Sequence, residues 1–376
     1  MGKSFSLPLA ITLLASLSSC TGIHYKTFRN GFSGVEGDIN PKTRIFLVGG
    51  GYPNATFARE VANQKEYWLS QGYSKEQIAC YYVPPHTDLI DEKGEFLKDT
   101  QQAEVLKQFE HLKHSVEDCF MASTKSLIRH IESLQKENPS SIYIYITGHG
   151  LPPLKHLSYV AISSKKSDKE SDVNDWIKDM NDRIKVEKSK KKWKKILSLE
   201  QWVNTYSLQM AAVRKKAFDT YYFMDPSAMA YEFAEDNPNA VNDYLLTPSG
   251  LSNALNKLPH STKKYLVLMG CYSGGFILPP QQAPQGHTLQ NVQNISVLTA
   301  SSSIKVSFIN PNDLKTFYGE SYFKNLKNLN KNKTFDSIDW KELLKETKES
   351  VLQKEKSLKI DPKLFSDPQF FSNMKN

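Results

Sequence analysis

Short runs of apolar residues alternate along the chain with segments in which apolar residues recur at helical spacing. The short runs cover residues 44–48, 78–83, 142–146, 266–269 and 295–300. Runs of this length, bounded by glycine, proline or polar residues, predict strands that are buried on both faces of a sheet. Helical spacing predicts helices over 55–71, 101–136 and 249–258, and again after Tyr318. This alternation predicts an α/β fold with a mostly parallel sheet and crossover helices.

Two segments depart from this alternation. Residues 161–240 are rich in charge and include the dense basic run Lys185–Lys195. This insertion is predicted to form a solvent-exposed helix face. The alternatives are a loop that is cleaved during activation and a segment that contacts anionic lipid. Residues 334–376 predict one lysine-rich helix with a capping signal at Asp336 and Ser337, followed by a loose end.

The N-terminus has the features of a secretory signal. Lys3 precedes the apolar stretch Leu7–Leu17, which is too short to span a bilayer but fits the apolar core of a signal peptide. The following Ser18-Ser19-Cys20 completes a pattern that resembles the lipobox of bacterial lipoproteins, so lipidation of Cys20 is expected. Ordinary secretion with cleavage near Ser19 is the alternative. Thr21 is not the aspartate of an inner-membrane retention signal, which favours the outer membrane in a cell that has one.

These boundaries predict four parts of the chain. They are a signal peptide over 1–19, a tether over 20–40, a folded domain over 41–330 with the insertion at about 161–240, and a helical tail over 331–376. The net charge of +8 arises from 48 basic and 40 acidic residues. Such a small excess, without an aromatic-basic motif, argues against nucleic acid as a partner.

The cysteines divide by predicted role. Cys20 is assigned to the lipid, which leaves Cys80, Cys119 and Cys271 in the folded part. In an oxidising compartment an odd thiol is either reactive or paired between chains. A bridge between Cys80 and Cys119 that leaves Cys271 free is one arrangement, although the sequence does not show the separation of their Cα atoms.

Two chemically active residues follow directly after buried strands. Cys271 ends the strand at 266–269 after Gly270, and His149 ends the strand at 142–146 and precedes Gly150. Parallel strands place these ends at one edge of the sheet, where an imidazole can take the proton of a cysteine thiol. The backbone N–H groups of Gly150 and Cys271 are then available to a developing oxyanion. Each residue alone is more often a packing residue, so the hypothesis depends on their matched context.

The glycines at 49–51 have a different interpretation. They follow a predicted strand, as in a dinucleotide-binding fingerprint, but Tyr52-Pro53-Asn54 stands where the third glycine is required. The spacing therefore argues against a dinucleotide site, and the glycines are expected to let the backbone turn tightly beside the site.

Five blocks of the sequence resemble the caspase-like cysteine peptidases, most closely the legumain family. The blocks are IYIYITGHG, LVLMGCYSGGF, RIFLVGGGYPN, SKEQIACYYV and ISVLTASSSIKVSF. The resemblance implies a three-layer α/β/α sandwich, His149 as the catalytic histidine and Cys271 as the nucleophile. It also implies an oxyanion hole made by Gly150 and Cys271 and a reaction without metal or cofactor, and it assigns the substrate region to Asn54, Ala300, Ser301 and Ser302.

One position departs from that family. Legumains carry a glutamate two residues before the nucleophile, in the primary specificity pocket, where this chain has Met269. An apolar side chain does not donate to or pair with a polar substrate group, so asparaginyl specificity is not expected.

The resulting hypothesis is a lipid-anchored cysteine endopeptidase of a bacterial cell envelope that acts on a protein or peptide substrate. Cys271 forms a thioester and His149 acts as general acid and base. The alternatives are a peptide transpeptidase that uses the same dyad, a catalytically silent binding module, and a thiol-sensing lipoprotein. The sequence does not predict the oligomeric state.

Overall fold

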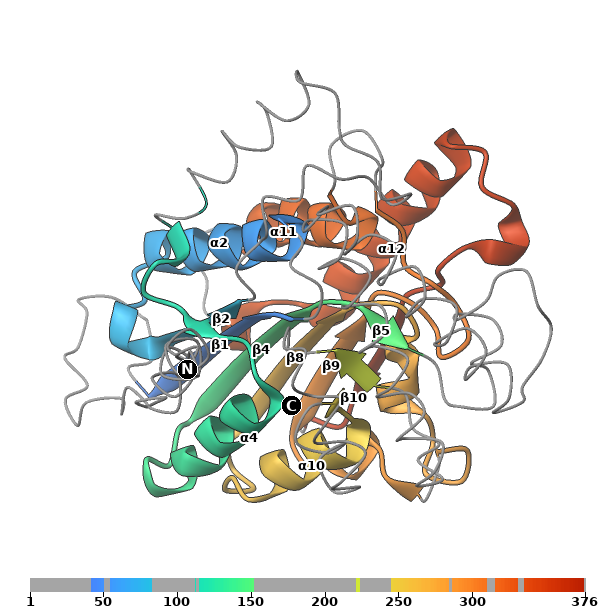
Figure 1. Ribbon diagram of the computed structural model, residues 1–376. Coiled ribbons are helices and arrows are strands. Elements are labelled where there is room, and N and C mark those ends of the chain that lie inside the picture. The colour runs from blue at the N-terminus through green and yellow to red at the C-terminus, as the bar shows by residue number, and fades with distance from the viewer. Residues whose placement is uncertain are drawn as a thin grey trace, which may run out of the picture. The chain divides into compact units, whose positions relative to one another are not determined.

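The computed structural model in Figure 1 describes most of the predicted folded domain. The described residues are 42–50, 55–82, 112, 115–151, 221–223, 245–283, 286–309, 315–330 and 335–374. The chain divides into two units, 1–31 and 32–376, and all described residues belong to the second. The signal peptide, Cys20, Asn54 and nearly all of the charged insertion therefore lie outside the described residues.

Seven strands of the described residues form one twisted sheet in the order β10-β9-β8-β4-β1-β2-β3. They are β1 Thr43–Gly49, β2 Ile78–Tyr82, β3 Phe120–Met121, β4 Ser141–Thr147, β8 Lys263–Met269, β9 Ile295–Thr299 and β10 Gln369–Ser372. All neighbouring strands pair in parallel except β10, which is antiparallel to β9. The predicted α/β fold with a mostly parallel sheet is confirmed.

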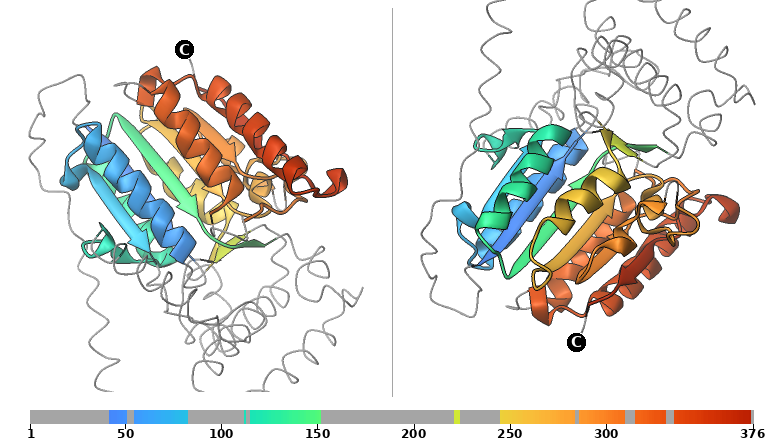
Figure 2. Two further views of the ribbon diagram at one scale, coloured as in Figure 1. Left: turned by 90° about the horizontal axis from the view of Figure 1, so that it is seen from above. Right: turned by 90° about the horizontal axis from the view of Figure 1, so that it is seen from below.

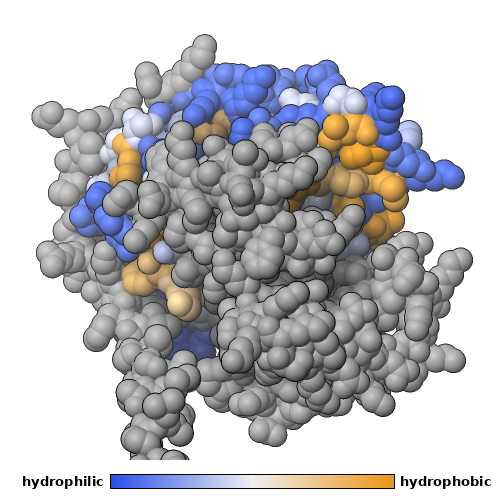
Figure 3. Space-filling model, turned by 45° about the horizontal axis from the view of Figure 1, so that its top comes forward, coloured by the Kyte–Doolittle hydropathy of each residue, from blue (hydrophilic) through white to orange (hydrophobic). Residues whose placement is uncertain are grey.

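Helices cover both faces of this sheet. Figures 1 and 2 show α2 Ala55–Ser70, α11 Phe317–Leu329 and α12 Trp340–Ser357 on one face, and α4 Thr124–Ser133 and α10 Pro248–Asn256 on the other. Every residue of β1 and β4 is consequently buried, which explains their continuous apolar sequences. In Figure 3, the coloured surface at the top of the view is mostly hydrophilic.

Aromatic side chains fill the layer between the sheet and helices α2, α11 and α12. Tyr143 of β4 stacks on Phe335 with ring centroids 4.8 Å apart, and Trp68 of α2 lies 4.2 Å from the same ring. The Tyr143 hydroxyl has a polar partner in the Tyr322 hydroxyl at 3.0 Å. Large rings with satisfied polar ends account for much of the contact between this helical layer and the sheet.

Three two- or three-residue strands form a second, small sheet. β5 Gly150–Leu151 pairs with β6 Tyr221–Phe223, which pairs with β7 Leu245–Leu246, all antiparallel. β7 leads into α10, and Thr247 caps that helix by accepting a hydrogen bond from the Gly250 N–H at 3.1 Å. The small sheet therefore connects the end of the His149 strand to the segment that precedes the Cys271 strand.

Two predictions about helices were wrong. The helix predicted over 101–136 is interrupted by β3, and α4 begins only at Thr124, where Ser123 provides the N-cap. The tail after 334 begins its helix at Trp340 with Asp339 as the cap, because the Asp339 side chain accepts from the N–H groups of Lys341 and Glu342. Its end is not loose, since Gln369–Ser372 forms the edge strand β10.

A disulfide joins Cys80 of β2 to Cys119 just before β3, with Cα atoms 4.8 Å apart. Cys271 is a free thiol among the described residues. The arrangement proposed from the sequence is therefore the one in the structure. No helix in the described ranges is both long and apolar enough to cross a bilayer.

His130 of α4 makes folding sensitive to acid. Its side chain is buried, contacts the Tyr81 hydroxyl through Nδ1 and lies edge-on to Phe46. Burial, with a smaller contribution from the charge of Arg44, lowers the pKa of His130 to about 4. The unfolded chain takes up this proton near pH 6.5, so His130 stabilises the fold above that pH and the stability is lost as the pH falls toward 4.

We expect the free energy of unfolding to fall between pH 7.5 and pH 5 by about 2 kcal/mol more in the parent than in His130→Gln. Denaturant unfolding at both pH values measures this difference. His260→Gln, at an exposed histidine, is the matched control and should behave as the parent. An equal pH dependence in the parent and His130→Gln would contradict the assignment.

Candidate functional site

Three parallel strands end together where the candidate site lies. The Gly50 N–H, after β1, donates to the Thr147 carbonyl of β4 at 2.9 Å, and the Gly148 N–H donates to the Met269 carbonyl of β8 at 3.3 Å. Thr147 and Met269 are register partners in the β4–β8 ladder. His149 and Cys271 each follow two residues later, so the structure brings them to the same edge of the sheet, as the sequence predicts.

The backbone of Gly150 lies directly against that of Cys271. A Cβ atom on Gly150 would lie 3.0 Å from the carbonyl carbon of Cys271 and closer still to its carbonyl oxygen. Real Cβ atoms do not approach backbone this closely, and no flexible side chain is present to move away. Glycine is therefore required at 150 for the His149 turn to reach the nucleophile turn.

The Cys271 sulfur lies beside the backbone of Ser307. The Ser307 N–H donates to Sγ at 3.3 Å, and the thiol is 3.6 Å from the Ser307 carbonyl oxygen. Burial raises the pKa of the Cys271 thiol, and the hydrogen bond from the Ser307 N–H opposes that rise. The resting cysteine is thus a neutral thiol at pH 7, and it needs a base in order to act as a nucleophile.

Tyr272 gives the turn after β8 its shape. Its φ of 57° lies in the left-handed region, which is costly for a bulky residue. The Tyr272 N–H donates to the Lys305 carbonyl at 2.8 Å, and its own carbonyl accepts from the Gly275 N–H at 2.9 Å. These bonds hold the turn that exposes part of Cys271. An unfavourable backbone conformation fixed by its surroundings next to a reactive group is typical of functional sites.

His149 stands beyond the end of β4 with an exposed side chain. Its ring packs edge-on against Phe57 of α2, with ring centroids 5.1 Å apart. Desolvation by the surrounding protein lowers the pKa of His149 to about 4. Solvent access to the exposed ring favours the imidazolium and opposes that shift. A lowered pKa makes His149 a neutral imidazole at pH 7, which is the form that accepts a proton.

The residues predicted for a substrate pocket do not form an open surface. Met269 and Ala300 belong to the hydrophobic core, and Ser301 is fully buried. The Ser301 hydroxyl donates to the Gly270 carbonyl at 3.1 Å, and the Ser301 N–H donates to the Ser273 hydroxyl at 3.1 Å. These side chains stabilise the nucleophile turn from inside. Ser302 is half-buried, with its N–H donating to Ser366.

Two contacts of the site were missed by the sequence analysis. Ser307 lies 36 residues after Cys271 and contacts its sulfur through the backbone, for which no side-chain pattern exists. Phe57 is one of several apolar residues of α2 at helical spacing, and nothing in the sequence distinguishes it as the residue against His149. The oxyanion role of Gly150 and the lipidation of Cys20 stay predictions.

Cys80, Cys119 and Asp118 have ligand atoms within 4.8 Å of one another. Both thiols are consumed by the disulfide, so this cluster lacks the thiolates that a metal site of this kind would use.

Comparison with protein-family models and with curated proteins finds no match. Among solved structures, the chain is similar to protein GSU0716 from Geobacter sulfurreducens, with a TM-score of 0.40 and 10% identity over 89% of this chain and 95% of that one. It is also similar to caspase-1 from Spodoptera frugiperda, with a TM-score of 0.39 and 7% identity over 89% of this chain and 88% of that one. Likenesses this distant carry no argument about activity.

We expect Gly150→Ala to destabilise the protein by about 1–3 kcal/mol and to displace Cys271, because the added methyl group would overlap the Cys271 backbone. Denaturant unfolding and the rate of Cys271 alkylation by iodoacetamide measure the two effects. Gly250→Ala is the matched control, since a Cβ there would meet only the Thr247 hydroxyl at 3.4 Å. Equal behaviour of the two variants would contradict the close approach.

Proposed function

We propose that this chain is a cysteine endopeptidase, with Cys271 as nucleophile and His149 as general base and acid. The observation that supports it most is the close approach of the Gly150 backbone to Cys271, which puts the residue after His149 against the nucleophile turn. Within the cysteine peptidases we assign it to the caspase-like group and to its legumain family, on the five sequence blocks given above.

The protonation states of the two residues fit this mechanism. A neutral thiol and a neutral imidazole start the reaction, and His149 takes the thiol proton as the Cys271 sulfur attacks the substrate carbonyl. The new C–S bond forms as the carbonyl π electrons move onto oxygen, beside the Gly150 and Cys271 N–H groups. His149 then returns the proton to the leaving amine. Water hydrolyses the thioester and restores the thiol.

A second function uses the same groups. An amine that replaces water in the last step would make the enzyme a transpeptidase. The exposed position of His149 gives solvent access on its side, which favours water as the acceptor.

We expect a mixed peptide library, analysed by mass spectrometry, to be cleaved by the parent full chain in mild detergent. Cys271→Ala and His149→Ala should each lose roughly a thousandfold or more in rate, because the dyad acts as a unit. His260→Ala, at an exposed histidine, is the matched control and should cleave as the parent. Added amines would reveal transpeptidation as ligated products.

Two negative results together would contradict the peptidase proposal. No cleavage by the parent, together with no labelling of Cys271 by an acyloxymethyl ketone, would favour the alternative of a binding module without catalysis.

We further propose that the protein is held in a bacterial cell envelope by a lipid on Cys20. The disulfide between Cys80 and Cys119 supports an oxidising compartment, where such bridges form and persist. Membrane attachment through a lipid needs no spanning helix.

We expect the parent chain, expressed in a bacterium, to incorporate labelled palmitate and to sediment with the outer membrane of a cell that has one. Cys20→Ser should lose the label and the sedimentation, whereas Ser19→Ala should keep both. Labelling of Cys20→Ser to the level of the parent would exclude this anchor.

A further inference from the structure

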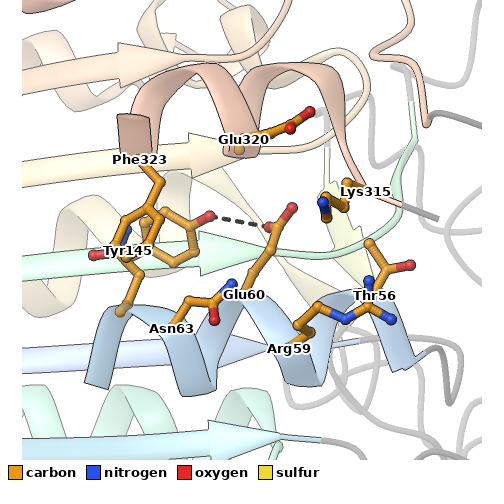
Figure 4. Close-up of a pocket in the computed structure, with 10 residues that line it drawn as sticks. Thr56, Arg59, Glu60, Asn63, Tyr145, Lys315, Glu320 and Phe323 are labelled. Atoms are coloured by element: carbon orange, nitrogen blue, oxygen red, sulfur yellow. Dashed lines mark hydrogen bonds between the residues drawn. The ribbon is translucent and has the colours of Figure 1, made fainter. Parts of the chain in front are cut away.

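A pocket of about 180 Å³ lies between helices α2 and α11, above β4 (Figure 4). It is lined by Thr56, Arg59, Glu60, Asn63, Gln64, Tyr145, Lys315, Gly319, Glu320 and Phe323. Glu60 projects from α2 into the space beneath α11, and its carboxylate meets the Tyr145 hydroxyl of β4 (Figure 4). The pocket thus contains a carboxylate that contacts three elements of the fold.

The Glu60 carboxylate has defined donors. The Tyr145 hydroxyl donates to Oε2 at 3.0 Å, and the Thr316 hydroxyl donates to Oε1. Thr316 is the N-cap of α11 and accepts from the Gly319 N–H at 3.0 Å. A side chain at 319 would collide with the Glu60 carboxylate, so glycine there lets the acid reach the first turn of the helix. Burial raises the pKa of Glu60, and these hydrogen bonds oppose the rise.

The same three elements hold the candidate active site. Phe57, one turn before Glu60 on α2, packs against His149. Tyr145 lies four residues before His149 on β4. Thr316 pairs with Ile309, and the Phe317 N–H donates to the Phe308 carbonyl at 2.9 Å, so the start of α11 fixes the segment that carries Ser307. Ser307 in turn contacts the Cys271 sulfur.

We propose that Glu60 is a positioning residue of this site, whose carboxylate fixes α2, β4 and the start of α11 relative to one another. It thereby sets where His149 and the Ser307 N–H lie relative to Cys271. This inference rests on the proposed peptidase function for its kinetic part only, because the reactivity of Cys271 reports the same positioning without any substrate.

The charge of Glu60 matters as well as its shape. A carboxylate next to the first turn of α11 interacts favourably with the positive end of the helix dipole. The other charged groups around it are Arg59 on α2, Lys315 just before α11, and Glu320 on α11, which pairs with Lys354 of α12. Tyr145 is the titratable group that faces it from β4. Glutamine keeps the length and one acceptor oxygen of Glu60 but removes the charge.

The test compares Glu60→Gln with Glu66→Gln in the full chain. Glu66 is an exposed residue of the same helix whose carboxylate accepts from the Ser115 hydroxyl, which makes it a matched control. Four quantities are measured: kcat and KM on a cleaved peptide, the rate of Cys271 alkylation by iodoacetamide from pH 7 to pH 11, located by peptide mapping, and the unfolding midpoint.

We expect Glu60→Gln to lower kcat about tenfold to a hundredfold with KM within about twofold, because displaced groups act on the reaction and not on substrate binding. The pH midpoint of Cys271 alkylation should rise, since a loosened Ser307 N–H stabilises the thiolate less. Glu66→Gln should match the parent in all four quantities.

The remaining results would distinguish a failure of the Glu60 proposal from a failure of the peptidase proposal. If Glu60→Gln equals Glu66→Gln in both kcat and alkylation, the proposal is overturned while peptide cleavage by the parent leaves the peptidase intact. If the parent cleaves nothing but the alkylation midpoint still shifts, the positioning role stands and the proposed function fails. A change in Cys271 alkylation that appears only where the folded fraction is lost also overturns it.

A second variant covers the case in which Glu60→Gln does not fold. Tyr145→Phe removes one donor to Glu60 and keeps the carboxylate. It should shift the alkylation midpoint in the same direction by a smaller amount, and an unchanged midpoint would count against the role of Glu60.

Discussion

The contact between the backbones of Gly150 and Cys271 is the constraint on which the candidate site depends. It follows from the pairing of β4 with β8, because Thr147 and Met269 are register partners and both chains then turn at the same level. A shift of one residue in this pairing would turn the side chains of one strand to its opposite face. Only glycine at 150 allows the two turns to approach this closely. The relative positions of His149 and Cys271 therefore depend first on this backbone contact and only then on side-chain interactions.

Around that contact, buried polar groups fix the nucleophile turn from below. Ser301 and Ser273 bond to each other and to the backbone on either side of Cys271, so no hydroxyl of this pair is left without a partner. A satisfied polar network of this kind favours a single conformation of the turn, because any rearrangement would leave a buried donor or acceptor without a hydrogen bond. Separate backbone bonds, to Lys305 and from Gly275, hold Tyr272 in its left-handed conformation.

The sequence predicted the central strands well because both of their faces are covered. β1, β4, β8 and β9 each contain a short run of mostly apolar residues, and the helices between them follow the 3.6-residue period. The prediction failed where local pattern and tertiary pairing differ. β10 has the sequence QFFS, in which polar and apolar residues follow no strand pattern that could predict it. It forms because the edge of β9 offers backbone hydrogen-bond partners. β3 interrupts a helical pattern because the disulfide and β2 fix Phe120–Met121 at the opposite edge.

For the site, the sequence alone determined that His149 and Cys271 follow parallel strands, since glycine-bounded apolar runs encode strand ends. The tertiary structure decided everything that depends on groups distant in the chain. It buried Met269, Ala300 and Ser301, placed the Ser307 N–H on the sulfur, and set Phe57 against His149. The physical reason is that backbone donors and packing partners carry no side-chain signature. Their roles exist only once the sheet register and the positions of α2 and α11 are fixed.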